Sequence, residues 1–119
     1  MTEQTTPRTC YARAGATLDT LRDQIDTMRR RAERMAARSC RSPQLRADCD
    51  EIIAALDRID GEICERLTML TADHTSRGDG ADYGHLTTST VNEYQPLLRY
   101  YHRRNEAAQV LHNAVPDNA

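Results

Sequence analysis

Apolar side chains recur at alternating steps of three and four residues through the first third of this 119-residue chain. The pattern persists for more than three heptads, at Tyr11, Ala14, Leu18, Leu21, Ile25, Met28, Ala32 and Met35. Such spacing places all of these side chains on one face of an α-helix and is typical of a coiled-coil seam. It predicts a helix over about residues 7–40, with Pro7 in the first turn.

A second seam follows a short break at residues 41–43. Ser42 is suited to capping a helix, and Pro43 is suited to its first position. The same alternation then occupies Leu45, Cys49, Ile52, Leu56, Ile59, Ile63 and Leu70, with Arg66 as an interruption. We expect a second helix over about residues 43–72. Because the break is so short, the two helices must lie side by side in opposite directions.

Residues 73–91 differ in composition, since they hold three of the five glycines and a Thr/Ser run. We interpret them as a polar loop. Thr90 and Asn92 each fit the opening of a capping box, and Pro96 favours the later start because proline belongs in a first turn. A third helix is therefore expected over about residues 92–114. Its stripe comprises Tyr94, Leu97, Leu98, Tyr101, Ala108, Leu111 and Val115, with Asn105 at a seam position.

The composition suits helix packing, because the chain is 39% hydrophobic but has no Phe or Trp. We predict an all-α protein with one domain over residues 1–119: a long antiparallel, coiled-coil-like hairpin plus a third helix, forming a three-helix bundle. An extended hairpin that dimerises is the alternative. Since few large side chains are available for burial, we expect stabilisation by a partner, either a second copy or a larger assembly.

Charge is distributed unevenly, although the net charge is only −2. Seven arginines and one acidic residue lie between residues 29 and 46, whereas most of the charged residues between 48 and 73 are acidic. One interpretation is pairing across the hairpin, for example Arg29 with Asp60 and Arg38 with Asp48. The other is that outward-pointing arginines at the hairpin tip form a binding surface. All sixteen cationic residues are arginines, whose planar guanidinium groups suit carboxylates and phosphates.

We assign partner binding to the arginines around the tip, namely Arg30, Arg34, Arg38, Arg41 and Arg46. A secondary basic surface is expected at Arg99, Arg103 and Arg104. The favoured function is a small non-catalytic protein–protein interaction module: an accessory subunit, adaptor or inhibitor that binds another protein or a larger complex. In size and composition the chain is similar to small phage-encoded inhibitors of host machinery. The alternative is a nucleic-acid-associated subunit of a ribonucleoprotein, against which a pI of about 6.1 counts.

No metal site, cofactor or catalytic residue is expected. The potential ligands Asp73, His74, Asp79, Asp82 and His85 do not match the spacing of an EF-hand. The cysteines, Cys10, Cys40, Cys49 and Cys64, fit no zinc pattern and are expected to be thiols. The chain has no N-terminal apolar run typical of a signal peptide and no segment that would span a bilayer, so we expect a cytoplasmic protein.

The stretch Leu21-Arg22-Asp23-Gln24-Ile25-Asp26 is similar to the opening of the all-helical chorismate mutase family. The resemblance implies an enzyme that binds a dianionic substrate with several inward arginines and a lysine. This chain has no lysine, and its first helix breaks at Pro43 where the family's helix continues. An enzyme of this kind is therefore the third hypothesis, after the two binding functions.

Overall fold

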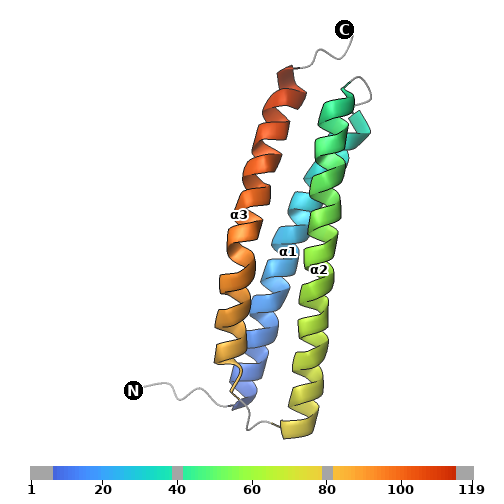
Figure 1. Ribbon diagram of the computed structural model, residues 1–119. Helices are drawn as coiled ribbons and strands as arrows, with labels where there is room; N and C mark the ends of the chain where they lie inside the picture. Colours follow the sequence, from blue (N-terminus) through green and yellow to red (C-terminus); the bar gives the residue numbers. More distant parts are fainter. Residues whose placement is uncertain (1–6, 39–41, 79–81, 115–119) are drawn as a thin grey trace.

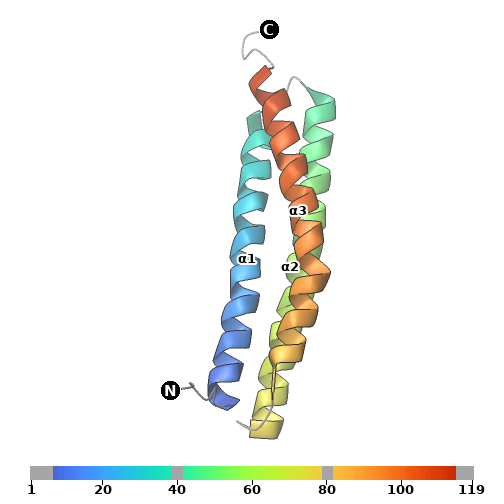
Figure 2. The same ribbon diagram turned by 90° about the vertical axis from the view of Figure 1, so that its left-hand side faces the viewer.

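The computed structural model describes residues 7–38, 42–78 and 82–114. These residues form three helices, α1 (Pro7–Arg38), α2 (Pro43–Arg77) and α3 (Gly84–Ala114), and include no strand. α2 runs antiparallel to α1, and α3 returns in the direction of α1 (Figures 1 and 2). Each helix packs against the other two along a rod with extents of 62 × 31 × 18 Å. The predicted three-helix bundle with a long antiparallel hairpin is confirmed.

The seams predicted for α1 and α2 form the core. Leu18 of α1 and Leu56 and Ile63 of α2 are completely buried, while Tyr11 and Met28 are half-buried and pack against the same cluster. Burying an aliphatic side chain stabilises a fold by roughly 1.5–3 kcal/mol. Because the buried side chains are spread along both helices, hydrophobic stabilisation is distributed along the rod.

The stripe predicted for α3 is confirmed only in part. Tyr94, Leu98 and Ala108 are buried, but Leu97 and Leu111 are 40% and 52% exposed. Val115 lies outside the described residues. The core face of α3 is therefore narrower than its apolar composition suggests.

The predicted loop over residues 73–91 is wrong, because α2 continues to Arg77 and α3 already begins at Gly84. Three of the four Thr residues in this stretch, Thr75, Thr87 and Thr90, are accommodated in a helix with their hydroxyl groups donating to carbonyls four residues earlier. Thr87 Oγ1 bonds to the Tyr83 carbonyl at 3.0 Å, and Thr90 Oγ1 bonds to the Leu86 carbonyl at 2.8 Å. Tyr83 and Thr90 are also buried, so tertiary packing outweighs weak helix propensity.

The helix ends explain the shorter connection. Gly78 has a φ of 71°, a value that favours glycine, and its N–H donates to the His74 carbonyl at the end of α2. The carboxylate of Asp82 accepts a hydrogen bond from the Gly84 N–H at 3.0 Å and caps α3. Pro96 therefore lies inside α3 rather than in its first turn, which corrects the predicted start at residue 92.

The start of α2 agrees with the sequence prediction. The Ser42 side chain accepts a hydrogen bond from the Leu45 N–H at 3.4 Å, and Pro43 occupies the first turn. α1 is described to Arg38, so the end predicted at residue 40 lies outside the described residues.

Two polar residues at seam positions bind α3 to its neighbours. The Arg66 guanidinium donates to Thr90 Oγ1 at 3.1 Å and to the Glu93 carboxylate, and lies 4.8 Å from the centre of the Tyr94 ring. Asn105 Nδ2 donates to the backbone carbonyl of Met28 at 3.0 Å. A polar residue at a single seam position selects one register at some cost in stability. These bonds therefore define how α3 lies against α1 and α2.

The environment of Tyr94 predicts that the stability of the fold depends on pH in the alkaline range. Its hydroxyl donates to Glu62 Oε2 at 3.0 Å, and burial followed by this bond raises the pKa of Tyr94 from 10.0 to about 12. The Tyr94 hydroxyl keeps its proton to a higher pH in the folded state than in the unfolded state. Its titration therefore does not change the free energy of unfolding below the pKa of the unfolded state. As the pH rises above 10.0 towards about 12, it should lower the free energy of unfolding by about 2–3 kcal/mol.

Urea unfolding of the wild type and Tyr94→Phe, at neutral pH and at several alkaline pH values, tests this. At neutral pH, Tyr94→Phe should be less stable by roughly 1 kcal/mol because it lacks the hydrogen bond. The gap should close and then reverse above pH 10.0, since Phe has no proton to lose. A gap that stays constant across this range would contradict the assignment.

Candidate interaction surface at the arginine-rich end

The end of α1, the beginning of α2 and the end of α3 meet at one end of the rod (Figures 1 and 2). We refer to it as the arginine-rich end. The described arginines that α1 and α2 contribute to it are Arg29, Arg30, Arg31, Arg34, Arg38 and Arg46. Arg41, the remaining predicted residue at the tip, lies outside the described part of the chain.

Arg29 connects α1 to α2. Its guanidinium donates to Asp57 of α2 at 2.9 Å and to Asp26 of its own helix at 2.9 Å. The hydrogen bond to Asp57 is the main cause of the raised pKa of Arg29. This arginine is consequently occupied within the bundle and is not available to a partner without breaking both bonds.

Arg31 connects α1 to α3. Its Nη1 donates to Glu106 Oε1 at 2.6 Å, and its Nε donates to Gln109 Oε1 at 3.4 Å. The hydrogen bond from Arg31 lowers the pKa of Glu106. The pair orients Arg31 and anchors the last turns of α3 beside α1.

Charge pairing across the hairpin is present, but the two predicted pairs are wrong. Asp60 binds Arg22 at 3.0 Å, while Arg29 binds Asp57. Among the described side chains, the cation nearest Asp48 is Arg104 of α3, at 4.0 Å, rather than Arg38. Arg29 therefore pairs with an acid three residues earlier on α2 than predicted, and Asp60 pairs with an arginine seven residues earlier on α1.

The outward arginines differ from Arg29 and Arg31. Arg34, Arg38 and Arg46 are exposed and make no ion pair with a described residue. Arg30 is intermediate, because its side chain is 68% exposed but its Nε lies 3.0 Å from Asp26 Oδ2. The structure therefore divides the predicted set into residues with internal partners and residues whose charge faces solvent.

Arg34 and Arg38 lie beside the end of α3, which contributes to their pocket. The pocket has a volume of about 150 Å³ and is lined by Arg31, Arg34, Met35, Arg38, Gln109 and His112. Glu106 is the adjacent acid, and its charge is compensated by Arg31. Guanidinium groups around a small recess suit the oxygens of a carboxylate or phosphate, which they bind by charge-assisted hydrogen bonds.

Sequence reasoning missed Gln109 and His112 as members of this site. The basic stretch in the sequence indicates a surface at the α1–α2 turn, whereas two of the six residues that line the pocket come from α3. The available signal was length: three helices of 32, 35 and 31 residues in alternating directions bring the end of the third beside the end of the first.

The arginines of the predicted secondary basic surface also differ in whether they have a partner within the bundle. Arg99 and Arg103 are exposed, but Arg104 donates to both carboxylate oxygens of Glu51, at 3.0 and 3.3 Å. This bond lowers the pKa of Glu51. Arg104 thus joins α3 to α2 instead of contributing an unpaired positive charge to the surface.

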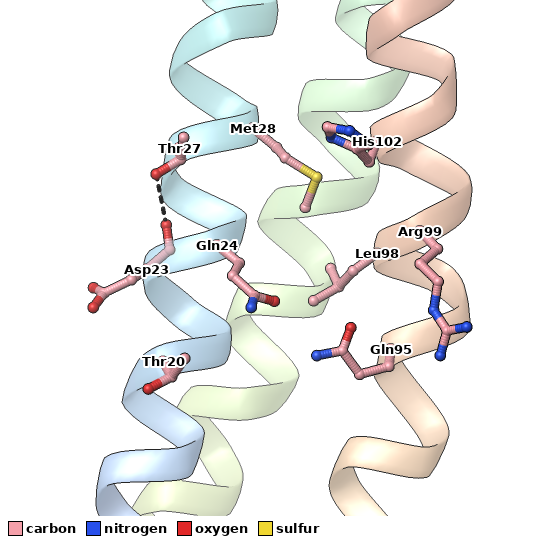
Figure 3. Close-up of a pocket in the computed structure, with 9 residues that line it drawn as sticks. All are labelled: Thr20, Asp23, Gln24, Thr27, Met28, Gln95, Leu98, Arg99 and His102. Atoms are coloured by element: carbon pink, nitrogen blue, oxygen red, sulfur yellow. Dashed lines mark hydrogen bonds between the residues drawn. The ribbon is translucent and has the colours of Figure 1, made fainter.

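Arg99 belongs to a different surface, a groove between α1 and α3 (Figure 3). The groove has a volume of about 470 Å³ and an apolar floor at Met28 and Leu98. Its other lining residues are Thr20, Asp23, Gln24, Thr27, Gln95, Arg99 and His102. Because these rim residues are polar and carry charges of both signs, the groove is not part of the basic surface.

Three of the five residues considered as metal ligands have other roles. Asp73 pairs with Arg77 at 3.0 Å, Asp82 caps α3, and the His74 ring stacks on Tyr11 with 3.8 Å between ring centres. Asp79 lies outside the described residues. In the part of the chain that the structure describes, no three potential ligands are grouped for a metal ion.

Two cysteines are described as free thiols. Cys49 is buried and Cys64 is half-buried. Burial raises the pKa of Cys49, which favours the protonated and unreactive form. Cys40 and the side chain of Cys10 lie outside the description.

The stretch similar to chorismate mutase lies at a predominantly acidic cleft between α1 and α2. Arg22 is bound to Asp60 there, and Arg29 is bound to Asp57. Four carboxylates and two guanidinium groups line the cleft: Asp19, Asp23, Asp26, Asp60, Arg22 and Arg29. An excess of negative charge opposes the binding of a dianion.

No protein-family model, curated protein or solved structure matches the chain. None of the described helices has an apolar stretch long enough to cross a membrane. We therefore infer a function from the geometry of the arginine-rich end.

The Arg31–Glu106 ion pair should protect the last turns of α3 from amide hydrogen exchange. Arg31→Ala should raise amide hydrogen-exchange rates in the last turns of α3, because these turns lose their ion pair with α1. Lowering the pH should likewise reduce the protection factors of these turns, which compare the observed exchange rate with the intrinsic rate at the same pH. The pKa of Glu106 is lowered from 4.5, so its contribution is present above this value and is lost as the pH falls through the lower folded-state pKa.

Arg34→Ala is the matched control, because it removes an arginine one turn away that has no ion pair with a described residue. The α3 amides of the Arg34→Ala variant should be as well protected from exchange as those of the wild type. Equal protection in Arg31→Ala and Arg34→Ala would show that the pair does not anchor α3.

Proposed function

We propose that the protein is a small non-catalytic interaction module, an accessory subunit, adaptor or inhibitor, that docks its arginine-rich end on an acidic face of a larger protein or complex. The supporting observation is the division of the arginines. Arg29 and Arg31 are bound to carboxylates of the bundle, whereas Arg34 and Arg38 are exposed beside a small recess without a described ion-pair partner.

The geometry favours recognition over catalysis. Arg34 and Arg38 lie four residues apart on one helix, so their Cβ atoms are separated by roughly 5–6 Å on the same face. The packed helix holds this spacing before a partner arrives, which lowers the entropy lost on binding. Arginine is enriched in protein interfaces and frequently binds carboxylates through two parallel hydrogen bonds.

The alternative partner is a nucleic acid, and the same pocket supports it, because guanidinium groups also bind phosphate. The acidic residues of α2 oppose this alternative, since an extended polyanion would pass close to them. The pI of about 6.1 adds to this opposition. We therefore favour a compact acidic protein face over a nucleic acid backbone.

In this function the protein acts in the cytoplasm and needs no cofactor. A phage-encoded inhibitor of a host complex is one form of this function that fits the size of the chain. It acts as part of an assembly, either paired with a second copy of itself or as a subunit of the larger complex.

A pull-down from the native cell or host with tagged protein tests the proposal. The wild type should capture a defined acidic partner, and Arg34→Glu/Arg38→Glu should recover at least about tenfold less of it, since interface arginines often contribute more than ~1 kcal/mol each. The control Arg13→Glu/Arg58→Glu makes the same change in net charge at exposed arginines elsewhere. It should retain wild-type capture.

Equal recovery by the two double variants would contradict docking through the arginine-rich end. The nucleic acid alternative is tested with generic RNA and DNA at about 50 mM salt, where phosphate contacts are strong. Binding that weakens steeply with salt, and whose salt slope is flattened in Arg34→Glu/Arg38→Glu, would favour the alternative over an acidic protein.

A further inference from the structure

Exposed apolar side chains gather on α3. Of the five large apolar side chains that are exposed in the described residues, four lie on this helix: Leu97, Tyr100, Val110 and Leu111, with exposed fractions of 40–68%. The fifth is Met69 of α2. A local group of exposed apolar side chains on a small protein is typical of an interaction surface.

The spacing of these residues indicates what kind of partner they suit. Leu97, Tyr100 and Leu111 belong to a stripe with alternating steps of three and four residues, and Val110 lies outside it. We call it the outer stripe: Leu97, Tyr100, Arg104, Ala107, Leu111 and Ala114. The core residues Leu98, Tyr101, Asn105 and Ala108 follow the same steps one position later. α3 therefore carries two adjacent seams, and α1 and α2 bury only one. A heptad-spaced seam packs best against another helix.

The outer stripe lies on the side of α3 that faces α2. Arg104, in the middle of the stripe, binds Glu51 at 3.0 Å and lies 4.0 Å from Asp48. Its guanidinium also lies 5.8 Å from the centre of the Tyr100 ring. Arg104 thus enters the stripe with its charge compensated, and its aliphatic stem adds to the apolar surface.

We infer that the outer stripe is the interface between two copies of this chain, with the two α3 helices packed parallel around a two-fold axis along the rod. The stripe is regular over more than two heptads, so a second copy presents a seam of identical spacing. Packing the two stripes together makes an isologous contact, in which the same residues are buried on both copies.

Charge at the two borders of the stripe selects the parallel arrangement. Arg103, next to Arg104 on the outer border, is exposed, and Glu51 is exposed on the α2 border at the level of Arg104. A two-fold axis along the rod places Arg103 opposite Glu51 of the second copy. An antiparallel arrangement centred on Arg104 would place Arg103 opposite Arg103 and Glu51 opposite Glu51, and such like-charge contacts are unfavourable.

The parallel arrangement places both arginine-rich ends at the same end of the dimer. Two basic recesses then face one acidic partner, and binding of the second benefits from a high effective concentration. The interface uses neither Arg34 nor Arg38. Dimerisation and docking can therefore fail independently, and each has its own experiment.

Light-scattering mass across a concentration series is the first measurement. The wild type should approach twice 13.5 kDa, and Leu97→Glu/Leu111→Glu should have the mass of one chain at the same concentrations. Met69→Glu is the control, because it places a glutamate on an exposed apolar residue outside the stripe, and its mass should equal that of the wild type. Helical circular dichroism and a melting curve for each variant show that the fold is retained.

Oxidative cross-linking determines the orientation. In the parallel dimer Leu97 meets Leu97 and Leu111 meets Leu111, so Leu97→Cys and Leu111→Cys should each form a covalent dimer when tested alone. The antiparallel dimer would bring Leu97 to Leu111, and a cross-link would then require a mixture of the two variants. The wild type, oxidised in parallel, gives the background from the native cysteines.

Three results would overturn the inference. They are a single-chain mass for the wild type at every concentration, a dimer that persists in Leu97→Glu/Leu111→Glu, and cross-links that form only in the mixture. A two-chain mass that is lost in the stripe variant and retained in Met69→Glu, together with cross-links in each single variant, supports it.

Discussion

Burial of aliphatic seams along the length of the rod is the constraint on which the rest of the structure depends. Without Phe or Trp, no single region can bury enough apolar surface, so stabilisation accumulates turn by turn along helices of 31–35 residues. α1 and α2 share most of this burial. α3 buries less, and it is tied to them by directed polar contacts, such as those of Arg66 and Asn105.

The carboxylates that the packed helices bring within reach of each arginine determine its role. Arg29 and Arg31 lie beside the seam and reach carboxylates on α2 and α3, whereas Arg34 and Arg38 remain exposed at the rim of a recess. The guanidinium group is the same in all four, so its chemistry cannot explain the difference. The neighbouring helices do, because Arg29 and Arg31 lie level with carboxylates of α2 and α3, whereas Arg34 and Arg38 have no such partner among the described residues.

Much of the fold could be predicted because heptad spacing reports directly on burial. Leu18, Ile25, Leu56 and Ile63 are core residues for this reason. The loop prediction failed because Thr87 and Thr90 were judged by intrinsic propensity, while their hydroxyl groups bond within the helix and Thr90 is buried. Of the candidate site, Arg34 and Arg38 were predicted, but the contribution of Gln109 and His112 depends on where α3 ends and could not be predicted from the basic stretch alone.

The sequence by itself determined that this chain forms long amphipathic helices, that the first two pair in opposite directions, and that positive charge concentrates near their junction. These properties follow from local spacing and from the shortness of the break between two helices. Only the tertiary structure decided which carboxylate each arginine meets, which side of α3 is buried, and which residues share a recess. Those outcomes depend on the axial register and rotation of three packed helices, and residues far apart in the chain set both together.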